Sequence, residues 1–347
     1  AAVAAAAAGS LRRRLRTLRR AEPPPAAETA EPKTKPKLAT KWVRTIAGLV
    51  IGLGFCGPCT FRGGWAFTFM MIAIVYFSVK EYDQLLALIL RPPLVPMMSW
   101  MHLAVSTGTV FAAQVGIRTG IFECSTVSLL FMLMILQGNT KQPDGGPPIT
   151  FSHLSSQVFG VFYTGYLPAF WVRLRGIKVH LSSEPSAALT GVVHKFLHWS
   201  IEPTVGCCAA TSCALCIIAA DVCAYAGGKS FGKTKLIRIS PGKTVEGLMC
   251  GLIGSVSMAV FLDAAWGFPA HPVIAALLGL VICATSLLGD LTVSAIKRDA
   301  GLKDAGAMIP GHGGVLDRFD SWFFTGPGVY FCWWLYLRVI GGSIPVA

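Results

Sequence analysis

The chain has 347 residues, of which 53% are hydrophobic and 14% are charged, so it is too apolar for a soluble protein of this length. Lysine and arginine number 30 against 17 acidic residues. This excess suits anionic lipid or a polyphosphate better than nucleic acid, because the sequence contains no recognisable nucleic-acid-binding module. The composition predicts an all-α, polytopic integral membrane protein.

Residues 1–44 differ in composition from the rest of the chain. A run of alanines leads into a cluster of arginines and then a tract rich in Pro, Ala and Lys, with few acidic residues. Such a leader is typical of an organelle transit peptide, although a basic tail that binds anionic lipid has the same composition. We therefore expect a transit peptide over 1–44 and a membrane-embedded domain over 45–347.

Apolar runs with the length of a membrane span recur through the second part. Roughly 17 to 25 residues are needed to cross a bilayer, and the runs predict about nine transmembrane helices, at 44–61, 64–80, 98–117, 121–137, 156–172, 204–226, 247–265, 272–289 and 322–341. A turn-like segment at 267–272 separates two of these runs, so the chain crosses and returns. The charged segments 221–247 and 289–321 should therefore face the same side of the membrane.

Three short motifs match the patterns of soluble nucleotide-binding or redox sites. Residues 52–57 fit GxGxxG, 56–59 read CGPC, and 227–234 fit GxxxxGK[ST]. Each lies in or directly after a membrane-length run and lacks the strand that these motifs require. We interpret the first as close helix packing through small residues, and the cysteines of the second as small hydrophobic residues of an apolar run. The third predicts a glycine-rich basic loop that binds phosphates or merely orients the protein.

Several carboxylates lie where an apolar run ends. Asp290 follows one run and Asp221 ends another, and an unpaired charge at the edge of the hydrocarbon is costly. A bound cation would relieve that cost, and Mg²⁺ takes one or two carboxylates together with phosphate oxygens and water. Asp290 and Asp317 are therefore the candidate metal ligands, supported by Asp221 and Asp320. The alternative is that these acids form ordinary interfacial ion pairs with neighbouring arginines.

A histidine between glycines precedes Asp317. His312 would contact phosphate, transfer a proton, or serve only as a structural hydrogen-bond donor. Gly311, Gly313 and Gly314 permit a close approach of the backbone to a ligand, which suits a turn that faces phosphate.

The segment from Ser294 to Asp320 resembles the signature of the phosphatidate cytidylyltransferases, also called CDP-diacylglycerol synthases, and 221–247 is similar to their second shared block. The resemblance implies an Mg²⁺-dependent nucleotidyltransferase that joins CTP and phosphatidic acid into CDP-diacylglycerol, releasing pyrophosphate, for the synthesis of phospholipids such as phosphatidylglycerol. The expected catalytic residues are Asp290, Lys297, Arg298, Lys303, Asp304, His312, Asp317, Arg318 and Asp320. The expected nucleotide- or phosphate-binding residues are Asp221, Lys233, Ser240, Pro241, Lys243, Thr244, Ser294, Gly313 and Gly314.

Residues 153–175 resemble the plastidial, cyanobacterial-like branch of this family. Together with the leader they favour a chloroplast membrane, with a mitochondrial or other organelle membrane as the alternative. The expected partners are CTP, phosphatidic acid and the lipid bilayer, with a homodimer as a further expectation.

One departure from the family pattern keeps other functions open. The family usually has a glutamate three residues after the aspartate that matches Asp290, whereas this chain has Val293. An inactive homologue that acts as a scaffold would explain this valine. A secondary transporter would explain the many spans, but it predicts acids near the midplane and internal repeats, and we find no repeat. Formation of CDP-diacylglycerol distinguishes the enzyme from both.

Overall fold

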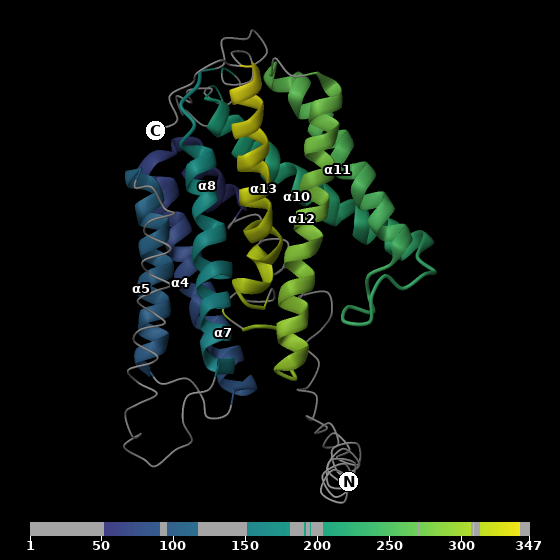
Figure 1. Cartoon of the computed structure of the whole chain (residues 1–347). Coiled ribbons are helices and arrows are strands. Elements are labelled where there is room, and N and C mark those ends of the chain that lie inside the picture. Colours follow the sequence, from purple (N-terminus) through teal and green to yellow (C-terminus); the bar gives the residue numbers. More distant parts are fainter. Residues whose placement is uncertain are drawn as a thin grey trace, which may run out of the picture. The chain divides into compact units, whose positions relative to one another are not determined.

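Helices make up most of the part of the chain that the structure describes (Figure 1). The computed structural model describes residues 52–90, 96–116, 151–180, 191, 195, 204–268, 271–306, 308 and 313–340, which all belong to the unit Val43–Ala347. Within these residues there is no strand, and the two β-bridges, His180 to Thr204 and Lys235 to Thr244, are isolated. The all-α prediction is confirmed, whereas the leader at 1–44 lies outside the described residues.

Among the described residues, three helices are long and apolar enough to cross a membrane: α10 (Val205–Phe231), α11 (Val245–Trp266) and α12 (Pro272–Asp299). They coincide with the runs predicted at 204–226, 247–265 and 272–289, and the chain is a polytopic membrane protein. The predicted spans at 64–80, 98–117 and 322–341 overlap α4 (Gly64–Ile89), α5 (Pro96–Val115) and α13 (Leu316–Ile340). The span predicted at 121–137 lies outside the described residues.

The run predicted as one span at 156–172 has a wider helical turn at its centre. α7 (Phe151–Gly160) continues through the π-helix η2 (Val161–Tyr166) into α8 (Leu167–Arg175). Pro168 stands in the first turn of α8, where its missing N–H group breaks no α-helical hydrogen bond.

The GxGxxG and CGPC matches both lie in helical turns. Residues 52–59 fall in the π-helix η1 (Gly52–Cys56) and in α3 (Gly57–Arg62), and Cys56 and Cys59 are free thiols. The GxxxxGK[ST] match at 227–234 begins in the last turn of α10. The third motif follows a helix and not the strand that a P-loop requires, so its helical context agrees with the sequence-based prediction.

Side chains at the start of α10 and α11 bind free N–H groups of these helices. Thr204 Oγ1 accepts the N–H of Cys207 at 3.2 Å, and Thr244 Oγ1 accepts the N–H of Gly247 at 3.1 Å. α11 ends at Gly267, whose φ of 63° is left-handed, as is common at helix C-termini. The chain then turns into α12, so α11 and α12 form the predicted hairpin.

Small residues allow the long helices to pack closely. A Cβ on Gly251 of α11 would lie 3.0 Å from the Ala220 carbonyl oxygen of α10. Between α11 and α12, Ser255 Oγ donates to the Gly279 carbonyl oxygen at 2.9 Å. α12 packs against α13 (Figure 1), where Phe323 and Val329 are fully buried. This packing brings the charged segments together near the C-terminal ends of α10 and α12.

Candidate functional site

The two charged segments, which the hairpin argument placed on the same side of the membrane, are in contact. Lys243, in the loop between α10 and α11, forms an ion pair with Asp290 of α12. Asp221 of α10 is close enough to Lys243 and Asp290 for their charges to interact. At the end of α12, Arg298 Nε donates to the Ile239 carbonyl oxygen at 3.5 Å. Residues from both segments therefore form one polar site.

A cavity of about 380 Å³ opens between α10, α11 and α12 at this site. Its polar lining consists mainly of Asp221, Lys229, Lys243, Thr244 and Ser286. Gly228 and Gly247 bring backbone to the same wall. A cavity of this size with a few convergent charged groups is typical of a small-molecule site. Its lysines suit an anionic ligand.

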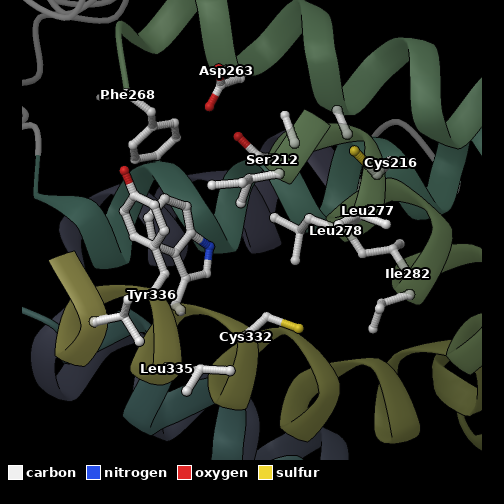
Figure 2. A pocket seen from close by; sticks show the side chains of 16 residues that line it. Ser212, Cys216, Asp263, Phe268, Leu277, Leu278, Ile282, Cys332, Leu335 and Tyr336 are labelled. Carbon is white, nitrogen blue, oxygen red and sulfur yellow. The ribbon is translucent and has the colours of Figure 1, made fainter. Parts of the chain in front are cut away.

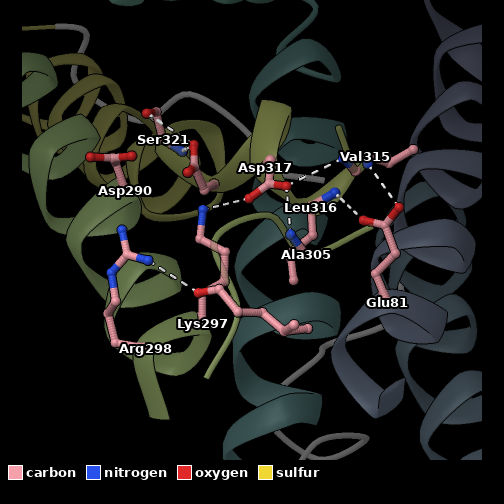
Figure 3. Close-up of polar contacts among 12 residues, drawn as sticks. Glu81, Asp290, Lys297, Arg298, Ala305, Val315, Leu316, Asp317 and Ser321 are labelled. Carbon is pink, nitrogen blue, oxygen red and sulfur yellow. Dashed lines mark hydrogen bonds and ion pairs between the residues drawn. The ribbon is translucent and has the colours of Figure 1, made fainter. Parts of the chain in front are cut away.

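Asp317 joins three segments of the chain (Figure 3). Its Oδ1 accepts a hydrogen bond from Lys297 Nζ of α12 at 2.6 Å. Its Oδ2 accepts the N–H groups of Ala305 at 2.7 Å and Gly314 at 3.2 Å. The Lys297 and Asp317 side chains are 12% and 5% exposed. Asp317 therefore binds the end of α12, the following loop and the start of α13.

Glu81 of α4 is a site residue that sequence reasoning missed. Its carboxylate accepts the N–H groups of Val315 at 3.0 Å and Leu316 at 2.8 Å, directly before Asp317 (Figure 3). Glu81 precedes Leu316 by 235 residues. The only sequence signal was an acid directly after the apolar run at 64–80, which gives no hint of its partner.

Asp320 is buried at the next helical turn of α13. It is 5% exposed, and its Oδ1 accepts the N–H of Ser321 at 2.6 Å. Its carbonyl oxygen accepts a hydrogen bond from the Tyr163 hydroxyl of η2 at 3.3 Å. The Asp320 carboxylate also lies within electrostatic reach of Asp290 and Lys297. The Asp320 side chain is thus close to the charged site, and its backbone is hydrogen-bonded to Tyr163 in the N-terminal half of the chain.

Loop 232–244 is held by Glu246, a second residue that sequence reasoning missed. The Glu246 carboxylate accepts the N–H groups of Lys233 and Thr234, each at 3.1 Å. The Ser240 carbonyl oxygen accepts the N–H of Lys243 at 3.1 Å. Lys233 and Pro241 are exposed. These backbone contacts orient the loop, and they leave the Lys233 side chain at the surface.

The other predicted residues vary in exposure. Lys303 and Asp304 are exposed in the loop after α12. Arg298 is exposed in the last turn of α12 and donates to the Leu302 carbonyl oxygen at 3.1 Å. Ser294 is 9% exposed on α12, and Arg318 is exposed on α13. Gly313 has a φ of 81°, a backbone conformation that favours glycine.

His312 and Gly311 lie outside the described residues. Val293 is fully buried in the core, so this position does not face solvent.

The acidic groups have the chemistry of an incomplete Mg²⁺ site. Within the described residues, no three His, Cys, Asp or Glu side chains are grouped so as to hold a metal ion unaided. Asp290 lies near Asp221 and Asp320, and its present cation is Lys243. Asp317 already receives three hydrogen bonds. Such a set fits Mg²⁺ only if phosphate oxygens and water complete the coordination, which is how Mg²⁺ is commonly bound beside nucleotides.

A second cavity, of about 360 Å³, lies toward the other end of α10, α11, α12 and α13 (Figure 2). Leu277, Leu278, Ile282 and Leu335 are among its many apolar lining residues. Ser212 and Asp263 are among the few polar ones. Ile282 lines this cavity and Cys283 lines the polar one, so consecutive residues of α12 contribute to both. The second cavity suits an apolar ligand and has no cluster of lysines for phosphate.

Comparison with known proteins agrees with this geometry. The model of the cytidylyltransferase family matches residues 42–336. The chain is 38% identical over 294 residues to phosphatidate cytidylyltransferase 5, chloroplastic, of Arabidopsis thaliana, covering 83% of this chain and 70% of the relative. It is 37% identical over 314 residues to the phosphatidate cytidylyltransferase of Synechocystis sp., covering 85% and 97%. Because the matched range includes both charged segments and the helices that join them, the chain belongs to the cytidylyltransferase family.

Proposed function

We propose that this protein transfers the cytidylyl group of CTP to phosphatidic acid, giving CDP-diacylglycerol and pyrophosphate. The observation that carries this proposal is the convergence of Lys243, Asp290, Lys297 and Asp317 from two segments, in a chain similar to enzymes named for this reaction. Neither a transporter nor an inactive scaffold is favoured by a specific feature of the described residues.

In this reaction a phosphate oxygen of phosphatidic acid bonds to the α-phosphorus of CTP as the bond to the β-phosphate oxygen breaks. The attacking phosphate is already an anion near neutral pH, so no strong base is needed. Lys229 and Lys243 line the polar cavity and would bind the phosphates of CTP. Lys297 and the exposed Arg298 and Arg318 would stabilise the charge that develops on pyrophosphate.

We further propose that the reaction requires Mg²⁺, held by Asp290 and Asp317 with Asp221 and Asp320 nearby. When bound, the ion would neutralise phosphate charge and orient the phosphates of CTP. Asp290 is the better placed of the two ligands, because its side chain is 29% exposed and its counter-ion is a lysine that also lines the cavity. Lys243 would be free to turn to a phosphate once Asp290 has another cation.

The apolar cavity offers a place for an acyl chain of the lipid substrate. Ile282 of the apolar cavity directly precedes Cys283 of the polar cavity on α12, so a lipid with its phosphate near Lys243 would extend its chain toward Ile282 and Leu278. Ala259 and Ala275 also line this cavity and are 6% and 5% exposed, so larger side chains there would shorten it.

We propose a chloroplast membrane as the location. The Arabidopsis thaliana relatives at 38% and 34% identity are both named as chloroplastic. The basic, acid-poor leader supports the same compartment. Import of residues 1–44 fused to a fluorescent protein into isolated chloroplasts tests the leader directly, and import into mitochondria instead would refute the proposal.

The test of the reaction is product formation by purified protein in detergent with CTP and phosphatidic acid, with and without Mg²⁺. We expect CDP-diacylglycerol only with Mg²⁺, and a loss of at least about 100-fold in Asp290→Asn. The matched control is Asp299→Asn, an exposed aspartate on the same helix, which should retain full activity. Well-folded wild-type protein that makes no product would refute the enzyme, and equal rates with and without Mg²⁺ would refute the metal.

A further inference from the structure

Glu81 is a buried carboxylate that reaches from α4 to the N-terminus of α13. The residue is 3% exposed, and each of its two carboxylate oxygens accepts one backbone N–H, from Val315 or Leu316 (Figure 3). The first N–H groups of a helix have no partner within that helix. Glu81 therefore accepts two N–H groups at the start of α13, and it places negative charge at the positive end of the helix.

The loop before α13 fits closely around this carboxylate. A Cβ added to Gly306 would lie 2.6 Å from Glu81 Oε1, and a Cβ added to Gly314 would collide with Oε2. Neither glycine has a positive φ, so the backbone conformation itself does not demand glycine at these positions. Glycine fits at these positions because the Glu81 carboxylate occupies the space that a side chain would need. Two glycines of the signature segment thus pack against a residue of another helix.

The two backbone N–H groups that Glu81 binds lie next to the polar site. Asp317 is the next residue after Leu316, and its side chain binds Lys297 at 2.6 Å. Two further hydrogen bonds from the same half of the chain reach the start of α13. Tyr163 donates to the Asp320 carbonyl oxygen at 3.3 Å, and Trp171 Nε1 donates to the Trp322 carbonyl oxygen at 2.8 Å. Of these contacts, that of Glu81 lies closest in sequence to Asp317.

We propose that Glu81 is a positioning residue for cytidylyl transfer. By binding the N–H groups of Val315 and Leu316, it fixes the first turn of α13 so that Asp317 stays against Lys297 of α12. Glu81 does not touch substrate in this role. The inference rests on the proposed function, because the reaction is what the fixed geometry serves, but the placement of the loop is measurable without that reaction.

The first variant is Glu81→Gln, and its matched control is Asp83→Asn. Glutamine keeps one acceptor oxygen but turns an NH₂ group toward the second backbone N–H, so one of the two bonds is lost. Asp83 lies on the same helix, and its carboxylate pairs at 2.8 Å with His102, not with α13. A misplacement of about 1 Å can cost about 100-fold in rate. We therefore expect kcat to fall about 10- to 100-fold in Glu81→Gln, and at most about twofold in Asp83→Asn.

The split between kcat and KM separates positioning from substrate binding. A residue that only holds Asp317 in place should act mainly in the transition state, so KM for CTP should change less than about threefold. Hydrogen exchange read peptide by peptide gives a second, activity-independent result. We expect faster exchange of the amides at 313–318 in Glu81→Gln, with unchanged exchange in α13 beyond residue 323. The hydrogen-exchange measurement tests the role of Glu81 even if wild-type protein makes no CDP-diacylglycerol. That outcome would refute only the proposed function.

Gly306→Ala tests the same contact from the other side, because it leaves Glu81 in place and pushes a methyl group against its Oε1. It should reproduce the loss of kcat. Wild-type kcat and wild-type exchange in Glu81→Gln would overturn the proposal. Equal losses of kcat and melting temperature in Glu81→Gln and Asp83→Asn would also overturn it, since both carboxylates would then only stabilise the fold. If Glu81→Gln cannot be purified folded, wild-type kcat in Gly306→Ala overturns it.

Discussion

The buried pair between Lys297 and Asp317 gives the sharpest test of how this site is held. The side chains are 12% and 5% exposed, and Asp317 also accepts the N–H groups of Ala305 and Gly314. Asp317→Asn leaves one side-chain oxygen for the three donors that Asp317 now binds. It also leaves the Lys297 ammonium without its counter-ion. Removing one partner of a buried pair costs about 3–5 kcal/mol, so we expect Asp317→Asn to lower the free energy of unfolding by about that amount.

The opposite substitution should cost less. Lys297→Met leaves the Asp317 carboxylate with two backbone donors, so only one charged hydrogen bond is lost, at a cost of about 1.5–3 kcal/mol. The double variant removes both charges together. We therefore expect its loss to be smaller than the sum of the single losses by about 1–3 kcal/mol, which is the coupling between the two side chains.

The assay is denaturant unfolding of the detergent-solubilised protein, with kcat measured on the same preparations. Lys235→Met, at an exposed lysine in the loop before α11, is the control and should change the free energy of unfolding by less than about 0.5 kcal/mol. Losses that add within about 0.5 kcal/mol in the double variant would refute the reasoning, because the two side chains would then not interact in the folded protein.

Three further substitutions probe the surroundings of the site. Gly289→Ala should abolish folding or activity, because its Cβ would collide with the Asp320 carbonyl oxygen; normal yield and melting temperature would contradict the close packing of α12 on α13. Val293→Glu should lower the melting temperature, since it buries a carboxylate at a fully buried position, and a more active and equally stable variant would contradict this. Ala275→Phe should reduce turnover of long-chain phosphatidic acid more than that of short-chain substrate, and an unchanged chain-length profile in a competition assay would remove the apolar cavity from the lipid path.

Much of the membrane domain was predictable from local sequence. Apolar runs of membrane length must form helices, since hydrocarbon offers no hydrogen-bond partners to an open backbone. The turn at 267–272 predicted that 221–247 and 289–321 face the same side of the membrane, and the ion pair of Lys243 with Asp290 joins the two segments. The wider turn at Val161–Tyr166 was not predictable, because periodicity does not distinguish a π-turn from an α-helix within an apolar run.

The site was only partly predictable, for a different physical reason. The sequence by itself determined the class of the chain, the helical segments and the charged residues that match the cytidylyltransferase signature, because composition and local pattern carry that information. Only the tertiary structure decided which group each charge would meet. Asp317 meets Lys297, 20 residues away, and Glu81 meets Leu316, 235 residues away. Such pairings depend on how helices pack side by side, and that packing brings together residues whose separation along the chain leaves no local signal.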